Sequence, residues 1–176
     1  MKNMKLFLLA GMAICCSFLP LLGTAQDFDG LNDQADDEYK AEHYQKAMDL
    51  ATRAINLKVN ARSYFIRADC RFSLKDYEAA LSDYNTAISG YSNYYTTDKY
   101  KGRLYYWRGR TKQKQAKYED AITDFDASFT YNYDEPGYAY WNRGNCYYET
   151  LEYQKADDDS DSHHGADERS ELREVV

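Results

Sequence analysis

The sequence predicts an all-α fold in which short helix–turn–helix units stack into a solenoid. The first observation is periodicity. In residues 103–129 apolar side chains recur at spacings of three and four, which places them on one helical face. The second is repetition, because versions of this stretch occur before and after it. The third is composition, since only 2 prolines interrupt a chain of 176 residues.

Residues 103–129 contain two predicted helices and a tight turn. The first helix runs from Leu104 to about Gln115, and the second begins near Tyr118. Gly109 lies inside the first helix, where glycine costs up to ~1 kcal/mol relative to alanine. A residue that costs stability there indicates close approach of a neighbouring backbone.

Alignment on Tyr118 finds three further copies of the stretch, beginning their second helices at Tyr44, Tyr77 and Tyr153. We call these four residues the anchor tyrosines. An alanine follows each anchor by three residues, and a small residue precedes it by nine. The two sets are Ala47, Ala80, Ala121 and Ala156, and Ala35, Ala68, Gly109 and Gly144. A generic four-helix bundle would not need this register.

The recurring pattern resembles the tetratricopeptide repeat over roughly residues 28–156. The resemblance implies a right-handed α-solenoid of about four units, with the first helix of each unit on the concave side. We expect a cap-like first unit, a second unit that contains an insert, a third, and a fourth whose second helix is incomplete. The ranges are 26–60, 61–101 with the insert at 91–100, 102–136 and 137–156. Residues 157–176 have no sustained apolar face and are expected to form a disordered acidic tail.

Three units carry an arginine ten residues before the anchor and an aspartate six residues after it. The arginines are Arg67, Arg108 and Arg143, and the aspartates are Asp83, Asp124 and Asp159. The first unit has Gln34 and Leu50 instead, so the two residue types come and go together. We hypothesise that each arginine pairs with an aspartate, within a unit or between neighbours, with its stem in the core. A row of ligand-binding arginines is the alternative.

Residues 1–25 have the features of a secretory signal peptide. Lys2 and Lys5 precede an apolar run over residues 6–22, and Gly23 and Ala25 supply small residues before a cleavage point. We therefore expect an exported protein of the periplasm or cell envelope, or a secreted one, with no membrane insertion after cleavage.

Two pairs of cysteines call for separate interpretations. Cys15 and Cys16 raise the alternative of a lipoprotein, but Ile14 stands where a small residue is wanted, so we expect no lipid anchor. Cys70 and Cys146 lie in units two apart, too far for a disulfide, and are expected to be buried free thiols.

The formal net charge is −7, and it becomes −9 when the two lysines of the leader are removed. An acidic chain without a Lys/Arg cluster is not expected to bind nucleic acid or anionic membranes.

The junction between the second and third units holds seven extra residues. Because seven residues are nearly two helical turns, the insert either lengthens the flanking helices in phase or forms a loop. Its tyrosines are suited either to contacts with a partner or to packing on those helices. They are Tyr91, Tyr94, Tyr95 and Tyr100.

The resemblance also implies which residues contact a partner. Carried onto this sequence, the concave positions form an aromatic row with a cationic centre. They include Arg62, Phe65, Asp69, Phe72, Arg103, Tyr106, Arg110, Gln113, Lys114, Tyr138, Trp141, Asn142, Asn145 and Tyr148. The set with which some relatives grip a chaperone carboxylate is incomplete here, because Asp69 stands where an asparagine is wanted. We expect capture of a protein or peptide segment.

Several functions remain open at the level of sequence. The leading hypothesis is an exported interaction scaffold for the assembly of cell-envelope complexes. The alternatives are a carbohydrate- or peptidoglycan-binding module and a truncated array without independent function. Self-association through the weakly capped end is also open. We predict no enzyme, cofactor or metal site, because no nucleophile–base arrangement or phosphate loop is present and His163–His164 lacks ligand spacing.

Overall fold

The computed structural model describes residues 28–90 and 98–171, with side chains after the gap described over 100–164. The predicted signal peptide, the cysteines at 15 and 16, residues 91–97 of the insert and residues 172–176 lie outside the described part.

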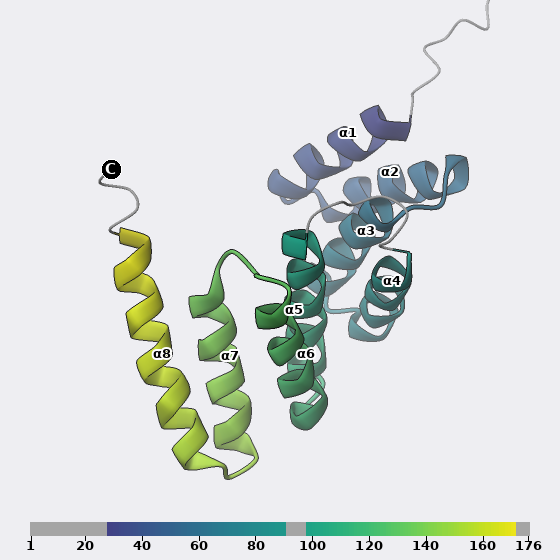
Figure 1. Cartoon of the computed structure of the whole chain (residues 1–176). Helices are drawn as coiled ribbons and strands as arrows, with labels where there is room; N and C mark the ends of the chain where they lie inside the picture. The colour runs from purple at the N-terminus through teal and green to yellow at the C-terminus, as the bar shows by residue number, and fades with distance from the viewer. Residues whose placement is uncertain (1–27, 91–97, 172–176) are drawn as a thin grey trace, which may run out of the picture.

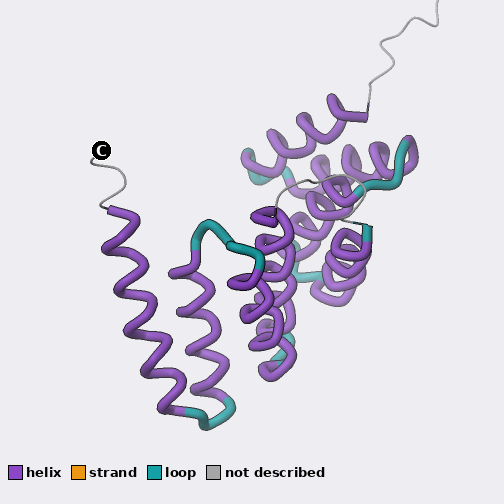
Figure 2. The backbone as a smooth tube through the Cα atoms, in the orientation of Figure 1, coloured by secondary structure: helices purple, strands orange, loops and turns teal. Residues whose placement is uncertain are grey.

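Eight helices form four successive antiparallel pairs, and the described residues contain no strand (Figures 1 and 2). Each pair packs on the next, so that α1 and α8 lie at opposite ends of the array. The helices are α1 (Phe28–Lys40), α2 (Tyr44–Leu57), α3 (Ala61–Ser73), α4 (Tyr77–Ser89), α5 (Asp98–Lys114), α6 (Tyr118–Thr130), α7 (Pro136–Glu149) and α8 (Tyr153–Glu171). The predicted all-α solenoid is confirmed.

One residue in each unit turns the chain from the first helix to the second. It lies two residues before the anchor, in the left-handed region with φ between 56° and 67°. The backbone N–H of the next residue donates to the carbonyl five residues back, as in His43 to Glu38 and Asp76 to Arg71. The four turn residues are Glu42, Lys75, Ala116 and Leu151.

The interior is built from small residues around two large rings. Ala47, Ala80 and Ala121 are fully buried, and Tyr84 and Phe125 fill the centres of the second and third units. A Cβ on Gly109 would lie 3.0 Å from Phe125 Cε1. The close approach predicted there is therefore made by a side chain rather than by a backbone.

The insert lengthens one of its flanking helices. Residues 98–101 belong to α5, which has 17 residues where α3 has 13. Tyr100, at its start, is exposed.

The expected disordered tail is wrong for most of its length, because α8 continues as a helix to Glu171. Asp159 is buried against α7 through Arg143, and Gln154 donates to Asp158 one turn later. A helix at the end of an array packs on one side only, so α8 needs no broad apolar face. Within the described residues no helix has the length and apolar character to cross a bilayer.

Candidate partner-binding face

The three predicted Arg–Asp pairs are all present, each within one unit. Two guanidinium nitrogens contact two carboxylate oxygens at 2.8 and 2.8 Å for Arg67, 2.8 and 2.5 Å for Arg108, and 2.8 and 2.6 Å for Arg143. The aspartate side chains are at most 5% exposed. This bidentate geometry joins the two helices of each unit.

Each of these arginines also donates to a side chain of the preceding unit. The acceptor is the residue eight positions after the anchor tyrosine of that unit. Arg67 donates to Thr52 Oγ1 at 3.4 Å, Arg108 donates to Asn85 Oδ1 at 2.9 Å, and Arg143 donates to Asp126. Each guanidinium is thus occupied by protein acceptors on both sides. The pairs are structural, and the alternative of a ligand-binding row finds no support in their geometry.

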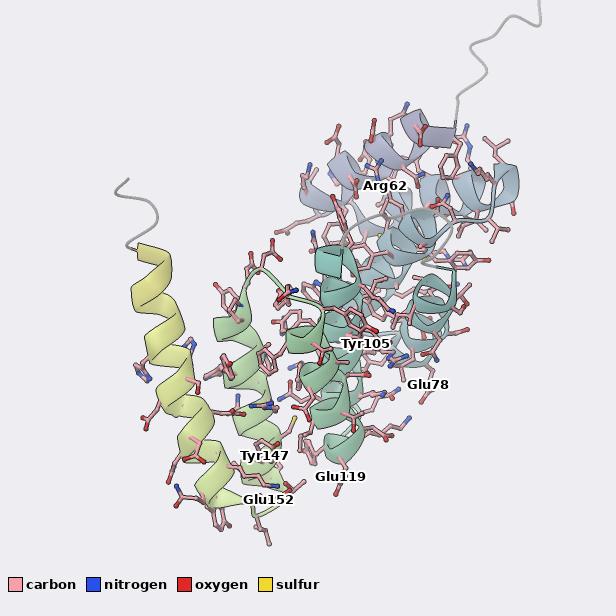
Figure 3. All side chains as sticks on the ribbon, in the orientation of Figure 1. Arg62, Glu78, Tyr105, Glu119, Tyr147 and Glu152 are labelled. Carbon is pink, nitrogen blue, oxygen red and sulfur yellow. The ribbon has the colours of Figure 1, made fainter. Side chains whose placement is uncertain are left out.

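A second group of cations lacks such partners. Arg103, Arg110 and Lys114 follow one another on α5 at spacings of seven and four, which places them along one side of the helix. We call them the cation stripe. Within the described residues none of the three forms an ion pair, whereas Arg62, labelled in Figure 3, contacts Asp33 and Asp36 at 2.7 and 2.5 Å.

Aromatic rings lie under the two arginines of the cation stripe. The guanidinium of Arg110 lies 5.1 Å from the ring centroid of Trp107 and 5.5 Å from that of Phe72. Arg103 lies 5.1 Å from the ring of Phe65. Ring faces attract a cation without neutralising it. The Nε of Arg110 is moreover buried with no hydrogen-bond partner in the described structure.

Exposed rings continue this face on α7. Tyr138, Trp141 and Tyr148 are 59%, 54% and 62% exposed, and Asn145 is exposed between the last two. Their spacings of three, four and three place all four residues on one stripe of α7, here called the ring stripe.

Three of the predicted contact residues are buried, so the prediction that they line a binding face is wrong. Asp69 accepts a 2.6 Å hydrogen bond from the hydroxyl of Tyr84, and burial raises the pKa of Asp69 to about 7. Tyr106 stacks on Tyr133 with ring centroids 4.5 Å apart. Asn142 donates to the carbonyl of Tyr138 at 2.7 Å.

Four more predicted contact residues are half-buried and engaged with neighbouring helices. Arg62 is neutralised by its two aspartates, and Phe65 and Phe72 lie beneath the guanidinium groups of α5. Gln113 donates to the carbonyl of Asn142 at 3.1 Å. The available face therefore consists of the cation stripe and the ring stripe.

Cys70 and Cys146 are buried free thiols, and burial raises the pKa of each to about 12. Within the described residues no three His, Cys, Asp or Glu side chains lie close enough together to hold a metal ion.

The chain matches the family model of the tetratricopeptide repeat at residues 32–94 and 106–156. It therefore belongs to the tetratricopeptide repeat family, a family of interaction scaffolds. A search of curated protein sequences returned no match.

Solved structures with the same fold include the protein MamA and two TPR domains in complexes with HSP90. A crystal structure of MamA superposes with a TM-score of 0.71 at 17% identity, covering 84% of this chain and 82% of MamA. The first TPR of Spaghetti (RPAP3), bound to the HSP90 peptide SRMEEVD, gives 0.56 at 22% identity, covering 76% and 92%. The TPR2AB domain of yeast Sti1, in a pHSP90 complex, gives 0.55 at 14% identity, covering 80% and 77%.

Proposed function

We propose that the protein is an exported scaffold that binds an acidic, partly apolar peptide segment of another protein. The segment lies across the cation stripe of α5 and the ring stripe of α7. The observation that carries this proposal is a set of three cations that form no ion pair with any described carboxylate, on a chain whose formal net charge is −7.

The positive charge of the cation stripe favours an acidic ligand there, and so does the restricted motion of its two arginine side chains. Arg103 and Arg110 are held over rings and lose little side-chain freedom when an anion arrives. A guanidinium also accepts a carboxylate in two-point contact, which adds direction to the attraction. The exposed rings of α7 supply apolar area beside these charges.

The HSP90 peptide in the Spaghetti structure contains two glutamates and an aspartate. That fold likeness supports a peptide ligand for this chain, while the unpaired cations support acidity in it. The features of residues 1–25 support export, and with it a role in assembling cell-envelope complexes.

Selection from a random peptide library tests the proposal. We expect sequences enriched in Asp and Glu beside apolar residues, with affinity that falls as salt rises. Replacing Arg103, Arg110 and Lys114 by glutamine should abolish the enrichment and weaken a selected peptide at least tenfold.

The matched control replaces Lys40, Lys75 and Lys117 by glutamine, since these exposed lysines lie at the end of α1 and in the turns after α3 and α5, and the net charge changes equally. Equal loss in both variants would show bulk attraction alone and would contradict a site on α5.

The ring stripe also favours a second candidate, a carbohydrate ligand, because exposed rings next to the amide of Asn145 suit sugar stacking. Titration with peptidoglycan fragments separates the two. Binding that Trp141→Ala abolishes and that the glutamine variant of the cation stripe retains would favour the glycan.

A further inference from the structure

Each unit but the last has its first helix covered by the first helix of the following unit. The covered residues lie twelve and five residues before each anchor. At the first of these places, Asn32 Oδ1 accepts a hydrogen bond from Ser63, Phe65 lies under Arg103, and the hydroxyl of Tyr106 accepts from Asn142.

The second place is covered in the same way. Phe72 meets the edge of Trp107 with ring centroids 5.5 Å apart and also lies under Arg110. Gln113 is joined to α7 through the carbonyl of Asn142.

In the fourth unit these two places hold Trp141 and Tyr148, and no first helix of a further unit covers them among the described residues. Tyr148 contacts the anchor of its own unit, Tyr153, with ring centroids 5.4 Å apart. Trp141 and Tyr148 are 54% and 62% exposed, whereas Asn32 and Tyr106 are 0% and 3% exposed. The uncovered rings thus mark the surface that would receive a following first helix.

The second helix of the last unit carries a hydrogen-bond acceptor at the same register as the acceptor that, in the third unit, binds the first helix of the following unit. Asp126 binds Arg143 from eight residues after its anchor, and Asp161 stands at the same place in α8. Asp161 is exposed, and Asp157, one turn earlier, is also exposed. We call Trp141, Tyr148, Asp157 and Asp161 the terminal face.

We infer that the terminal face is a docking site for a basic amphipathic helix of a partner protein. The internal interface between the second and third units serves as the template. There Arg103 covers Phe65, Arg108 reaches Asn85, and Arg110 covers Phe72. The partner helix presents the same pattern, with arginines at spacings of five and two, over Trp141, Asp161 and Tyr148.

A second copy of the chain does not fit this site. Its first helix has Asp29, Gln34 and Asp36 where α5 has its three arginines. Head-to-tail stacking would place the two acids of α1 toward a face that already carries Asp157 and Asp161, and like charges repel. The occupant is therefore a basic helix and not α1 of another copy.

A labelled peptide with the sequence of residues 98–114, held helical by a side-chain bridge, serves as the probe for the full-length protein. Fluorescence anisotropy should show saturable binding. A control peptide with its three arginines replaced by glutamine should bind at least tenfold more weakly, which corresponds to 1.4 kcal/mol or more.

Variants of the protein locate the site. Asp161→Arg and Trp141→Ala should each weaken the probe about tenfold or more, while the exposed Asp120→Arg on α6 should not. A probe with aspartate at the place of Arg108 should recover affinity for the Asp161→Arg variant. The glutamine variant of the cation stripe should bind the probe normally, which separates this site from the proposed acidic-peptide site.

No binding of the probe, equal binding of the control peptide, or indifference to both variants would overturn the inference. Sedimentation equilibrium tests the remaining possible occupant, which is a second copy of the chain. Self-association that Asp161→Arg abolishes would show that a second copy occupies the face and would likewise overturn the inference.

Discussion

At the scale of single residues, the buried aspartates Asp83, Asp124 and Asp159 are each neutralised by an arginine of the same unit. Asp124 is 2% exposed at its side chain and accepts from Arg108 and from Lys112, whose Nζ lies 2.9 Å away. A buried carboxylate with two cationic partners leaves those partners stranded when it is removed.

Replacing Asp124 by alanine should therefore lower the free energy of unfolding by ~3 kcal/mol or more, because two half-buried cations lose their counter-ion. Urea unfolding measures the change. Thr123→Ala, an exposed substitution on the same helix, should cost little and serves as the control. A loss of less than ~0.5 kcal/mol for Asp124→Ala would contradict a buried structural pair.

Asp69 differs from Asp124, because no cation among the described residues forms an ion pair with it. Burial raises the pKa of Asp69 to about 7, above the value near 4 of an unfolded chain. The folded state then binds more protons than the unfolded state between about pH 4 and pH 7, so stability falls as pH rises through that window.

Asp69→Asn should remove this part of the pH dependence, since the amide oxygen still accepts from the hydroxyl of Tyr84. We expect the variant to gain about 2 kcal/mol over the parent between pH 5 and pH 7. Thermal or urea unfolding at several pH values measures it. Parallel pH profiles for the two proteins would contradict a protonated Asp69 in the fold.

At the scale of helices, the turns carry a small strain that the packing tolerates. Leu151 lies in the left-handed region with φ 66° and is 70% exposed. A branched side chain there costs roughly 1 kcal/mol relative to glycine and gains nothing from burial.

Leu151→Gly should accordingly stabilise the protein by ~1 kcal/mol, less any loss from the greater freedom of the unfolded chain. The midpoint of urea unfolding measures the change. Leu74→Gly makes the same substitution one residue before such a site, at φ −79°, and should destabilise instead. Loss of stability in both variants would contradict the strain at Leu151.

Helix pairing could be predicted from the sequence, while the extent of the last helix could not. The anchor register gave the units and the arginine pairs, because both recur at fixed spacing. Apolar periodicity failed at α8, whose exposed Asp157 and Ser160 stand where earlier units have apolar core. The Asp159–Arg143 pair ties α8 to α7 without an apolar stripe.

The candidate partner-binding face was also predicted only in part. The anchor register identified which residues of the first helices occupy the predicted contact positions. Their exposure depends on the side chains that the next unit packs against them. Tyr106 and Trp141 hold equivalent places, yet Tyr106 is buried by Tyr133 and Trp141 is 54% exposed. Sequence spacing alone does not distinguish these two outcomes.

At the scale of the whole molecule, acidic and basic side chains are concentrated in different parts of the array rather than evenly mixed. Acids gather on α1 and α8 at the two ends, and the unpaired cations lie on α5 in the middle. Such sorting gives the two proposed sites opposite preferences, an acidic segment for α5 and a basic helix for the terminal face. Because Trp141 and Tyr148 belong to both proposed sites, the acidic segment and the basic helix should compete for these two rings.

The arginine pairs bear on how the array would respond to a pull on its ends. Arg108 and Arg143 each join three consecutive helices, so load passes through the last three units by guanidinium contacts in series, ionic except for the hydrogen bond from Arg108 to the amide of Asn85. The first unit has no such clamp, and its ionic link to the second unit is instead made by Arg62, which contacts Asp33 and Asp36 of α1. A pull on α1 would therefore load Arg62, whereas a pull on α8 would load Arg143.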